Sequence, residues 1–259
     1  MVTKVTERPA GWCYSWRLME ILTGIHHFKT DPFNWYLIVD GGRVTLVDAG
    51  FPGHFPVLLD GLQSIGRGLK DIEAVVVTHA HADHMGFAER VRRITRAPVF
   101  VHRADVVAAG RARQLPWWGL LSNAWRPFMA STLTRAIRNG VFWASGIAEI
   151  RTVLDGDELD IPGRPRVIHA PGHTPGQIAL HIPARQVLLS SDVLVTRDLL
   201  TGAHGAPQLA HRSLNADHQQ AGRTLASLRE LGLVTLLPGH GRPWTGRMDK
   251  IVDEAQLPA

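Results

Sequence analysis

Residues 75–86 read VVVTHAHADHMG and place four side chains that commonly bind metals within six positions. They are His79, His81, Asp83 and His84. Imidazole and carboxylate groups are ligands that zinc, manganese and iron accept. Two histidines at i and i+2 suit a loop that holds one ion, because a helix would present such a pair at i and i+4. The stretch therefore predicts a metal site in a turn, directly after a strand that ends at about Val77.

Three later segments offer further ligands. HAPGHTPGQ presents His173 between two Pro-Gly turns, LLSSDVLV carries Asp192 after an apolar run, and TLLPGHGRPW sets His240 between two glycines. Glycine lets another group approach the backbone closely, and proline stiffens a loop. Taken singly, each residue is also explained as an ordinary loop histidine or a helix-capping aspartate. Together they complete two metal sites.

Short strands that alternate with helices must position these side chains. Residues 34–40 and 43–50 predict a hairpin that turns at Gly41-Gly42. Helical spacing of apolar residues is found over 54–66, 85–95 and 216–231. The runs AVVVTH, APVFVH, PRVIHA, QIALHI and QVLLSSD predict further strands. Strands outnumber helices in each half, which suits two packed sheets flanked by helices.

Length and composition are those of a globular domain. The chain has 259 residues, of which 45% are hydrophobic and 20% charged, so we expect a single domain over 1–259. Its one cysteine, Cys13, excludes an internal disulfide and a cysteine-based zinc site. The N-terminal segment lacks the apolar centre of a signal peptide, and no run approaches the roughly 18 apolar residues of a membrane span. We therefore expect a cytoplasmic protein without a transmembrane segment.

The net charge of +5 is concentrated in one segment, 110–145, which has no acidic residue. Its five arginines are Arg111, Arg113, Arg126, Arg135 and Arg138. The sequence has no zinc-finger spacing, no RNA-binding signature and no lysine-rich tail. A nucleic-acid partner is therefore not expected.

The motifs THAHADHMG, PGHTPGQ, SSD and LPGHG, with LVDAG upstream, resemble in order and approximate separation those of the metallo-β-lactamase superfamily of hydrolases. The resemblance extends over about residues 20–245. It implies an α+β fold, a four-layer αββα sandwich with a dinuclear metal centre along one edge. Asp48 in LVDAG matches the acid that this family places beneath the site, where it would hydrogen-bond a ligand histidine. The alternative is an ordinary turn aspartate before Gly50.

The same resemblance implies a ligand set. The first metal would be held by His79, His81 and His173, and the second by Asp83, His84 and His240, with Asp192 bridging the two ions. Two divalent ions, zinc first and manganese or iron as alternatives, would share a water and lower its pKa to about 7. The resulting hydroxide would attack an ester, thioester, lactone or phosphoester. Asp83 would orient the hydroxide and carry the proton to the leaving group.

Several branches of the superfamily have features that this sequence lacks, which limits the branches to which it could belong. Only 19 residues follow His240, so we expect no helical C-terminal domain of the glyoxalase II type. True metallo-β-lactamases lack the bridging aspartate and are exported. Acyl-homoserine lactonases are similar in layout, but the only tyrosines here, Tyr14 and Tyr36, do not match the one they place near the reacting carbonyl. A mononuclear-iron persulfide dioxygenase, a phosphoester hydrolase and a non-catalytic binding protein stay open as alternatives to a hydrolase of small esters, thioesters or lactones.

The segment 110–145 is an expected helical insertion, rich in tryptophan and arginine, where relatives have a shorter link. Met129, Leu133, Ile137 and Val141 recur every four residues, as along one helix face. Pro116 and Pro127 should divide the segment. Its tryptophans are Trp117, Trp118, Trp125 and Trp143. The segment could pack as core, form a lid or homodimer surface that lines a hydrophobic channel, or lie on a membrane. Its arginines would suit an amphipathic or anionic small-molecule substrate.

Other residues are candidates for a pocket rim, each also explained as an ordinary loop residue. They are Phe51, His54, Phe55, Arg197, His204 and His211. His26, His27 and His102 are expected to be structural.

Overall fold

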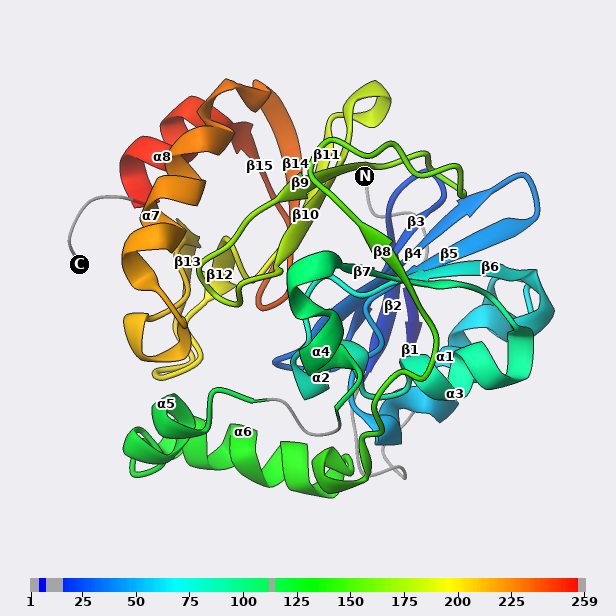
Figure 1. Cartoon of the computed structure of the whole chain (residues 1–259), viewed down its shortest axis with the longest axis horizontal. Coiled ribbons are helices and arrows are strands. Elements are labelled where there is room, and N and C mark those ends of the chain that lie inside the picture. The colour runs from blue at the N-terminus through cyan, green and yellow to red at the C-terminus, as the bar shows by residue number, and fades with distance from the viewer. Residues whose placement is uncertain (1–4, 8–15, 112–114, 256–259) are drawn as a thin grey trace.

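A computed structural model describes residues 5–7, 16–111 and 115–255 (Figure 1). Cys13, Tyr14 and Arg113 lie outside the described residues. The first sheet has eight strands, which neighbour one another in chain order. They are β1 (Val5–Glu7), β2 (Arg17–Leu22), β3 (Ile25–Lys29), β4 (Asn34–Asp40), β5 (Arg43–Val47), β6 (Ile72–Val76), β7 (Val99–His102) and β8 (Ile150–Val153). Strands β1 to β5 pair antiparallel, and β5 to β8 pair parallel.

The second sheet has five strands in the order β15-β14-β11-β10-β9. They are β9 (Arg166–His169), β10 (Ile178–Ile182), β11 (Val187–Ser191), β14 (Leu233–Pro238) and β15 (Trp244–Arg247). A separate two-stranded ribbon joins β12 (Val195–Arg197) to β13 (His204–Gln208). The α-helices are α1 (Phe55–Ser64), α2 (Ala82–Met85), α3 (Ala88–Thr95), α4 (Val106–Ala109), α5 (Trp117–Ser122), α6 (Pro127–Arg138), α7 (His218–Ser227) and α8 (Met248–Ala255). The 3-10 turns are η1 (Pro52–His54), η2 (Leu69–Asp71), η3 (Arg103–Asp105), η4 (Val141–Trp143), η5 (Pro183–Arg185), η6 (Arg212–Leu214) and η7 (Leu228–Leu231).

The molecule has four layers, helices, first sheet, second sheet and helices, with a hydrophobic cluster between each layer and the next. The expected αββα sandwich is therefore confirmed. Leu58 of α1 and Val91 of α3 pack with Leu46 against the outer face of the first sheet. Ile38 and Leu180 lie in the cluster between the two sheets. On the far side, α7 and α8 cover the second sheet in a third cluster. Burial of both sheet faces explains why β6 and β11 read as nearly continuous apolar runs rather than as alternating ones.

The expected hairpin is also confirmed. Asp40 of β4 pairs with Arg43 of β5, and the two glycines between them form the turn. Gly41 has φ +64, a left-handed conformation that glycine adopts without steric cost. Because β5 to β8 run parallel, their carboxyl ends meet at the same edge of the sheet. The histidine-rich loop follows β6 at this edge.

The insertion forms α5 and α6, which lie together along the lower edge of the molecule in Figure 1. Pro116 and Pro127 precede or begin these helices, as expected. The expected helix face was wrong: Ile137 is exposed and Val141 lies beyond the helix, in η4. An α-helix turns every 3.6 residues, so a strict four-residue repeat drifts around the axis. The buried positions of α6 are Met129, Thr132 and Ala136.

An ion-pair group fastens α6 to the core. Nη1 of Arg135 lies 3.1 Å from Oδ2 of Asp31 and 2.7 Å from its backbone oxygen. Arg197 of β12 pairs with the other carboxylate oxygen of Asp31 and also lies over the ring of Phe128, 4.5 Å from its centroid. The insertion is therefore held at the same edge as the histidine-rich loop. Among the described residues, no helix is long and apolar enough to cross a bilayer.

Candidate metal centre

All seven expected ligand residues converge at one edge of the sandwich. His79 and His81 lie in the loop after β6, as expected. Asp83 and His84 do not lie in a turn, because α2 begins directly after His81 and includes both. The backbone N–H of Met85 donates to the carbonyl of His81 at 3.0 Å, which closes this short helix. The rings of His79 and His84 lie 4.0 Å apart between centroids, so this short stretch supplies ligands to two adjoining groups.

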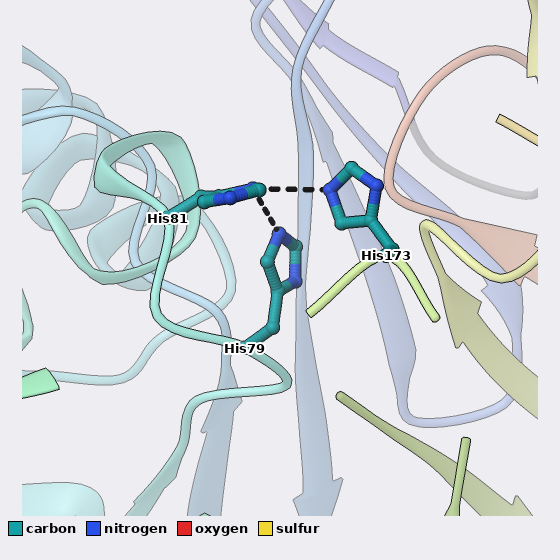
Figure 2. A group of neighbouring side chains, drawn as sticks. All are labelled: His79, His81 and His173. Carbon is teal, nitrogen blue, oxygen red and sulfur yellow. Dashed lines mark hydrogen bonds between the residues drawn. The ribbon is translucent and has the colours of Figure 1, made fainter. Parts of the chain in front are cut away.

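Three histidines form the first group (Figure 2). Nδ1 of His81 lies 3.0 Å from Nε2 of His79 and 3.0 Å from Nε2 of His173. His173 comes from the loop between β9 and β10, so the group joins both sheets. Ligand nitrogens around a tetrahedral ion with bonds of about 2.0–2.1 Å lie about 3.3 Å apart. The three nitrogens are therefore spaced as ligands of one ion.

The second group consists of Asp83, His84 and His240. Oδ2 of Asp83 lies 3.5 Å from Nε2 of His84 and 3.7 Å from Nε2 of His240. All three residues are buried. His240 follows β14 of the second sheet, so this group also spans both sheets.

Asp192 lies between the two groups. Its Oδ2 is 3.4 Å from Nε2 of His173 and 3.1 Å from Nε2 of His240, and its Oδ1 is 3.6 Å from Nε2 of His84. It thus contacts one histidine of the first group and two of the second. A carboxylate placed in this way can bridge two ions.

Two buried atoms support the fit to metals. Nε2 of His84 and Oδ1 of Asp192 have no hydrogen-bond partner among the described residues. A buried polar atom without a partner is costly, so native structures rarely leave one unexplained. The two atoms lie 3.6 Å apart among the ligand residues, where a bond to a metal would satisfy each of them. The donor set of imidazole nitrogens and carboxylate oxygens fits divalent ions of the zinc type.

Three ligand histidines have their other ring nitrogen held by the protein. Nδ1 of His84 lies 2.8 Å from Oδ2 of Asp48, as expected for the acid beneath the site, and Asp48 also accepts from the backbone N–H of Thr78 at 2.8 Å. Nδ1 of His173 lies 3.1 Å from Oδ1 of Asn215, and Nδ1 of His240 lies 3.1 Å from the carbonyl of Pro32. Such partners fix the tautomer that leaves the other nitrogen free for a metal.

The sequence did not reveal Asn215 or the carbonyl of Pro32 as partners. It also did not reveal Asp105, which is buried in η3. The carboxylate of Asp105 accepts from the backbone N–H groups of Ala80 and Gly176 at 3.0 and 2.7 Å, and from the hydroxyl of Thr174 at 2.8 Å. It therefore ties the loop of His79 and His81 to the loop of His173. An aspartate six residues after the start of a strand carries no sequence signal for this task.

The histidines of the two groups differ in their electrostatics. Burial lowers the pKa values of His79 and His81 well below the usual range, which keeps these rings neutral and able to bind metal. Burial also lowers the pKa of His84, but the carboxylates around it, led by that of Asp48, outweigh burial and raise this pKa to about 10. The negative charge of the site is therefore concentrated around His84 in the second group.

Clefts open at the ligands. One of about 450 Å³ extends from His81 and His173 to Trp117 and Trp118 of α5. Its other lining residues are mostly apolar, including Ala108, Leu115, Pro116 and Leu214. A second, of about 950 Å³, is lined by His173, Asp192 and His240 of the ligand set and by Arg197 and His211 among others.

Only some of the residues expected at the pocket rim line a space beside the ligands. Phe51 lines a narrow space beside Asp83, under the insertion. His54 and Phe55 are buried, and Phe55 belongs to the core cluster of α1 and α3. His204 lies exposed on β13. Of the histidines expected to be structural, His26, His27 and His102 are all buried.

Comparisons with known proteins agree with this geometry. The family model described as the Metallo-beta-lactamase superfamily matches residues 30–240. The chain is 26% identical over 244 residues to the probable metallo-hydrolase YflN of Bacillus subtilis (strain 168), covering 88% of each chain. It is 29% identical over 167 residues to the acyl-coenzyme A thioesterase MBLAC2 of Homo sapiens, over 64% of this chain and 54% of that protein.

Solved structures show the same architecture. The metallo-beta-lactamase family protein TTHA1429 from Thermus thermophilus superposes with a TM-score of 0.62 at 21% identity, covering 98% of this chain and 79% of that one. TTHA1623, solved in a di-iron-bound form, superposes with a TM-score of 0.54 at 26% identity, covering 82% of this chain and 89% of that one. The first likeness supports the fold alone, and the second pairs the fold with a dinuclear centre in that protein.

Proposed function

The chain belongs to the metallo-β-lactamase superfamily and is a metal-dependent hydrolase, and from this premise we propose that it cleaves small amphipathic esters, thioesters or lactones at a dinuclear zinc centre. The observation that carries the proposal is that the two ligand groups adjoin and that His81 and His173 of the first group open onto a mostly apolar cleft. The whole chain is proposed to act as one domain, with 110–145 as an insertion that borders the site.

In this proposal each ligand has a defined task. His79, His81 and His173 hold one ion, Asp83, His84 and His240 hold the other, and Asp192 bridges them. Manganese or iron could occupy the same donors, but imidazole and carboxylate ligands at tetrahedral spacing favour zinc. Bound there, two divalent ions supply a water with a pKa of about 7 and polarise the electrophilic oxygen of the substrate.

The protein's own groups would do the remaining work. Asp48 and Asn215 keep the rings of His84 and His173 oriented, through contacts of 2.8 and 3.1 Å. Asp83 lines the narrow space under the insertion, where its carboxylate would orient the attacking oxygen. The carboxylate oxygen of Asp83 that does not bind the ion would accept the proton and pass it to the leaving oxygen or sulfur, as a general acid–base group does.

The substrate class follows from the cleft between the ligands and α5. Leu115, Pro116 and Leu214 give it apolar walls, and its one lining acid, Asp105, already accepts three hydrogen bonds. An alkyl or acyl group fits such walls better than a charged group, because apolar contact is stabilising and an unpaired charge is not. The leaving group would occupy the larger cleft, whose lining has charged residues of both signs, among them Arg212 and Asp198, and suits a polar group. The thioesterase named among the relatives is consistent with this class.

A chain-length series tests the proposal. Zinc-loaded protein is assayed with acetyl, hexanoyl and dodecanoyl thioesters, the matching esters, lactones and a phosphodiester. We expect turnover of the carbon esters with a KM that falls as the acyl chain lengthens. Trp118→Ala should raise KM for the dodecanoyl substrate roughly tenfold, as expected for lost contact with about two methylenes at about 0.8 kcal/mol each. KM for the acetyl substrate should not change.

The matched control is Trp244→Ala. Trp244 is also an exposed tryptophan but lies on β15, outside the clefts that reach the ligands. This variant should behave as the parent does with every substrate. Cleavage of the phosphodiester alone, or a KM that is independent of chain length, would contradict the proposed substrate class.

A further inference from the structure

The outer surface of the insertion is unusually apolar. Seven of the thirteen exposed large hydrophobic side chains identified among the described residues lie in 115–145, and we call these seven the tryptophan surface. They are Trp117, Trp118, Leu121, Trp125, Ile137, Phe142 and Trp143. Trp118, Trp125 and Trp143 are 87%, 74% and 76% exposed, which is far from the usual burial of this residue. Single exposed apolar residues need no explanation, but a concentration on one segment indicates a binding surface.

The helices show that this exposure is organised. Gly119, Leu120 and Asn123 face the protein, and Gly119 fits so closely that an added Cβ would meet the carbonyl oxygen of Ser213. Trp118 and Leu121, three residues apart, lie on the opposite face of α5 and point away from the core. The short helix is therefore amphipathic with its bulky apolar face turned outward. Figure 1 shows α5 and α6 at the edge of the molecule, with no other element on their outer side.

The charge of this surface has one sign. Residues 115–145 contain Arg126, Arg135 and Arg138 and no acid, and of these Arg135 pairs with Asp31 outside the insertion. The guanidinium of Arg126 lies 4.8 Å from the ring centroid of Trp125, so a cation and an aromatic ring are presented together.

The elements beside the insertion add further arginines. Arg212 is exposed in η6, which packs against α5. Arg90 and Arg93 border Trp143 together with Glu89, whose carboxylate is paired with Arg92 at 2.8 Å. The surroundings of the tryptophan surface are therefore predominantly cationic.

We propose that the tryptophan surface docks the protein onto an anionic phospholipid surface. Tryptophan favours the boundary between headgroups and acyl chains, because its ring is apolar and its N–H can still reach a polar partner. Arginines beside it would be attracted to anionic headgroups. Docking would be peripheral and salt-sensitive, since the residues form short helices without a spanning segment.

A second copy of this chain is a poorer occupant. In a two-fold dimer the same patch faces itself, so the insertion arginines of one copy would face those of the other. Arg135 already pairs with Asp31, and the insertion contains no acid that a second copy could present to Arg126. Anionic lipid supplies the missing charge. Because Trp117 and Trp118 also line the cleft that leads to His81 and His173, docking would place the entrance of the proposed substrate cleft beside the lipid, which matters only if the proposed function holds.

Vesicle sedimentation tests the docking. The full metal-loaded chain is mixed with vesicles of phosphatidylcholine alone, or of phosphatidylcholine with phosphatidylglycerol, at low and high NaCl. We expect binding to the mixed vesicles only, and weaker binding in high salt because charges are then screened. The double variant Trp125→Ala/Trp143→Ala should lower the partition coefficient at least about tenfold, because two interfacial anchors are lost. Both residues are well exposed and neither lines the cleft, so the variant should fold and keep its turnover of a short water-soluble ester.

Trp244→Ala is the matched control and should bind vesicles as the parent does. Equal binding to both vesicle types, no binding to either, or binding that the double variant leaves unchanged would each overturn the proposal. A parent chain that elutes as a dimer and becomes a monomer in the double variant would assign the surface to a second copy instead. A failure of hydrolysis with vesicle binding intact would count against the proposed function and leave the docking supported.

Discussion

Oδ2 of Asp48 lies 2.8 Å from Nδ1 of His84, and both side chains are almost completely buried. Asp48 has φ +61, a left-handed conformation that asparagine also tolerates. Asp48→Asn should therefore keep the backbone while removing the charge that holds the ring of His84. We expect the affinity for the second ion to fall roughly 10- to 100-fold, the usual effect of losing a partner of a metal-binding histidine.

Competition with a fluorescent chelator measures the affinity for the first and for the second ion separately. Asp253→Asn, which breaks an exposed pair with Arg229, is the control and should leave both affinities unchanged. An equal loss at both ions, or none at either, would contradict the assignment of Asp48 to the second site.

Asp105 links the two loops that carry the first histidine group. Asp105→Ala removes the acceptor of three buried hydrogen bonds. The N–H groups of Ala80 and Gly176 then lose their hydrogen-bond partner. We expect the free energy of unfolding to fall by about 3 kcal/mol or more, since a hydrogen bond to a charged group contributes about 1.5–3 kcal/mol. Urea unfolding with metal removed measures this. A loss below about 0.5 kcal/mol would show that the loops hold their positions without Asp105.

His81→Ala should abolish turnover and leave the sandwich folded. His81 lies in a loop at the edge of two sheets whose cores it does not join, so its loss should remove a metal ligand without opening a core. Circular dichroism with zinc analysis on the same sample separates the two effects. Full activity, or an unfolded chain, would refute the assigned role.

His27 should make stability depend on pH. It is fully buried in β3, and burial lowers its pKa from 6.5 to about 4. The unfolded chain therefore takes up the proton first as the pH falls. The stabilisation is fully present above pH 6.5 and is lost between pH 6.5 and 4, by up to about 3 kcal/mol at the lower end.

His27→Leu should reduce this slope. Urea unfolding of the parent and of His27→Leu, in chelator between pH 6.5 and 4, gives the difference in their free energies of unfolding. The ligand histidines titrate in both proteins, so their contribution cancels in this difference. Parallel pH profiles for the two chains would contradict the burial-driven shift.

Much of the fold and of the candidate site could be predicted because local sequence determined it. The hairpin at Gly41-Gly42 depends on turn chemistry between two adjacent strands, and the ligand motifs occupy strand ends that the fold brings together. Asp105 and Asn215 could not be predicted, because their partners lie 25 to 71 and 42 residues away along the chain. The insertion was predicted to be helical, but its buried face was wrong because a four-residue repeat does not stay on one side of an α-helix.

Metal content measured together with turnover tests the central claim most directly. The protein is purified without added metal, analysed by mass spectrometry and assayed at once with the panel of esters, thioesters, lactones and a phosphodiester. The account predicts close to two divalent ions per chain, zinc foremost, with hydrolysis of a carbon ester that is lost on chelation and restored by zinc. One iron per chain with oxygen consumption and no hydrolysis would contradict it and indicate a dioxygenase.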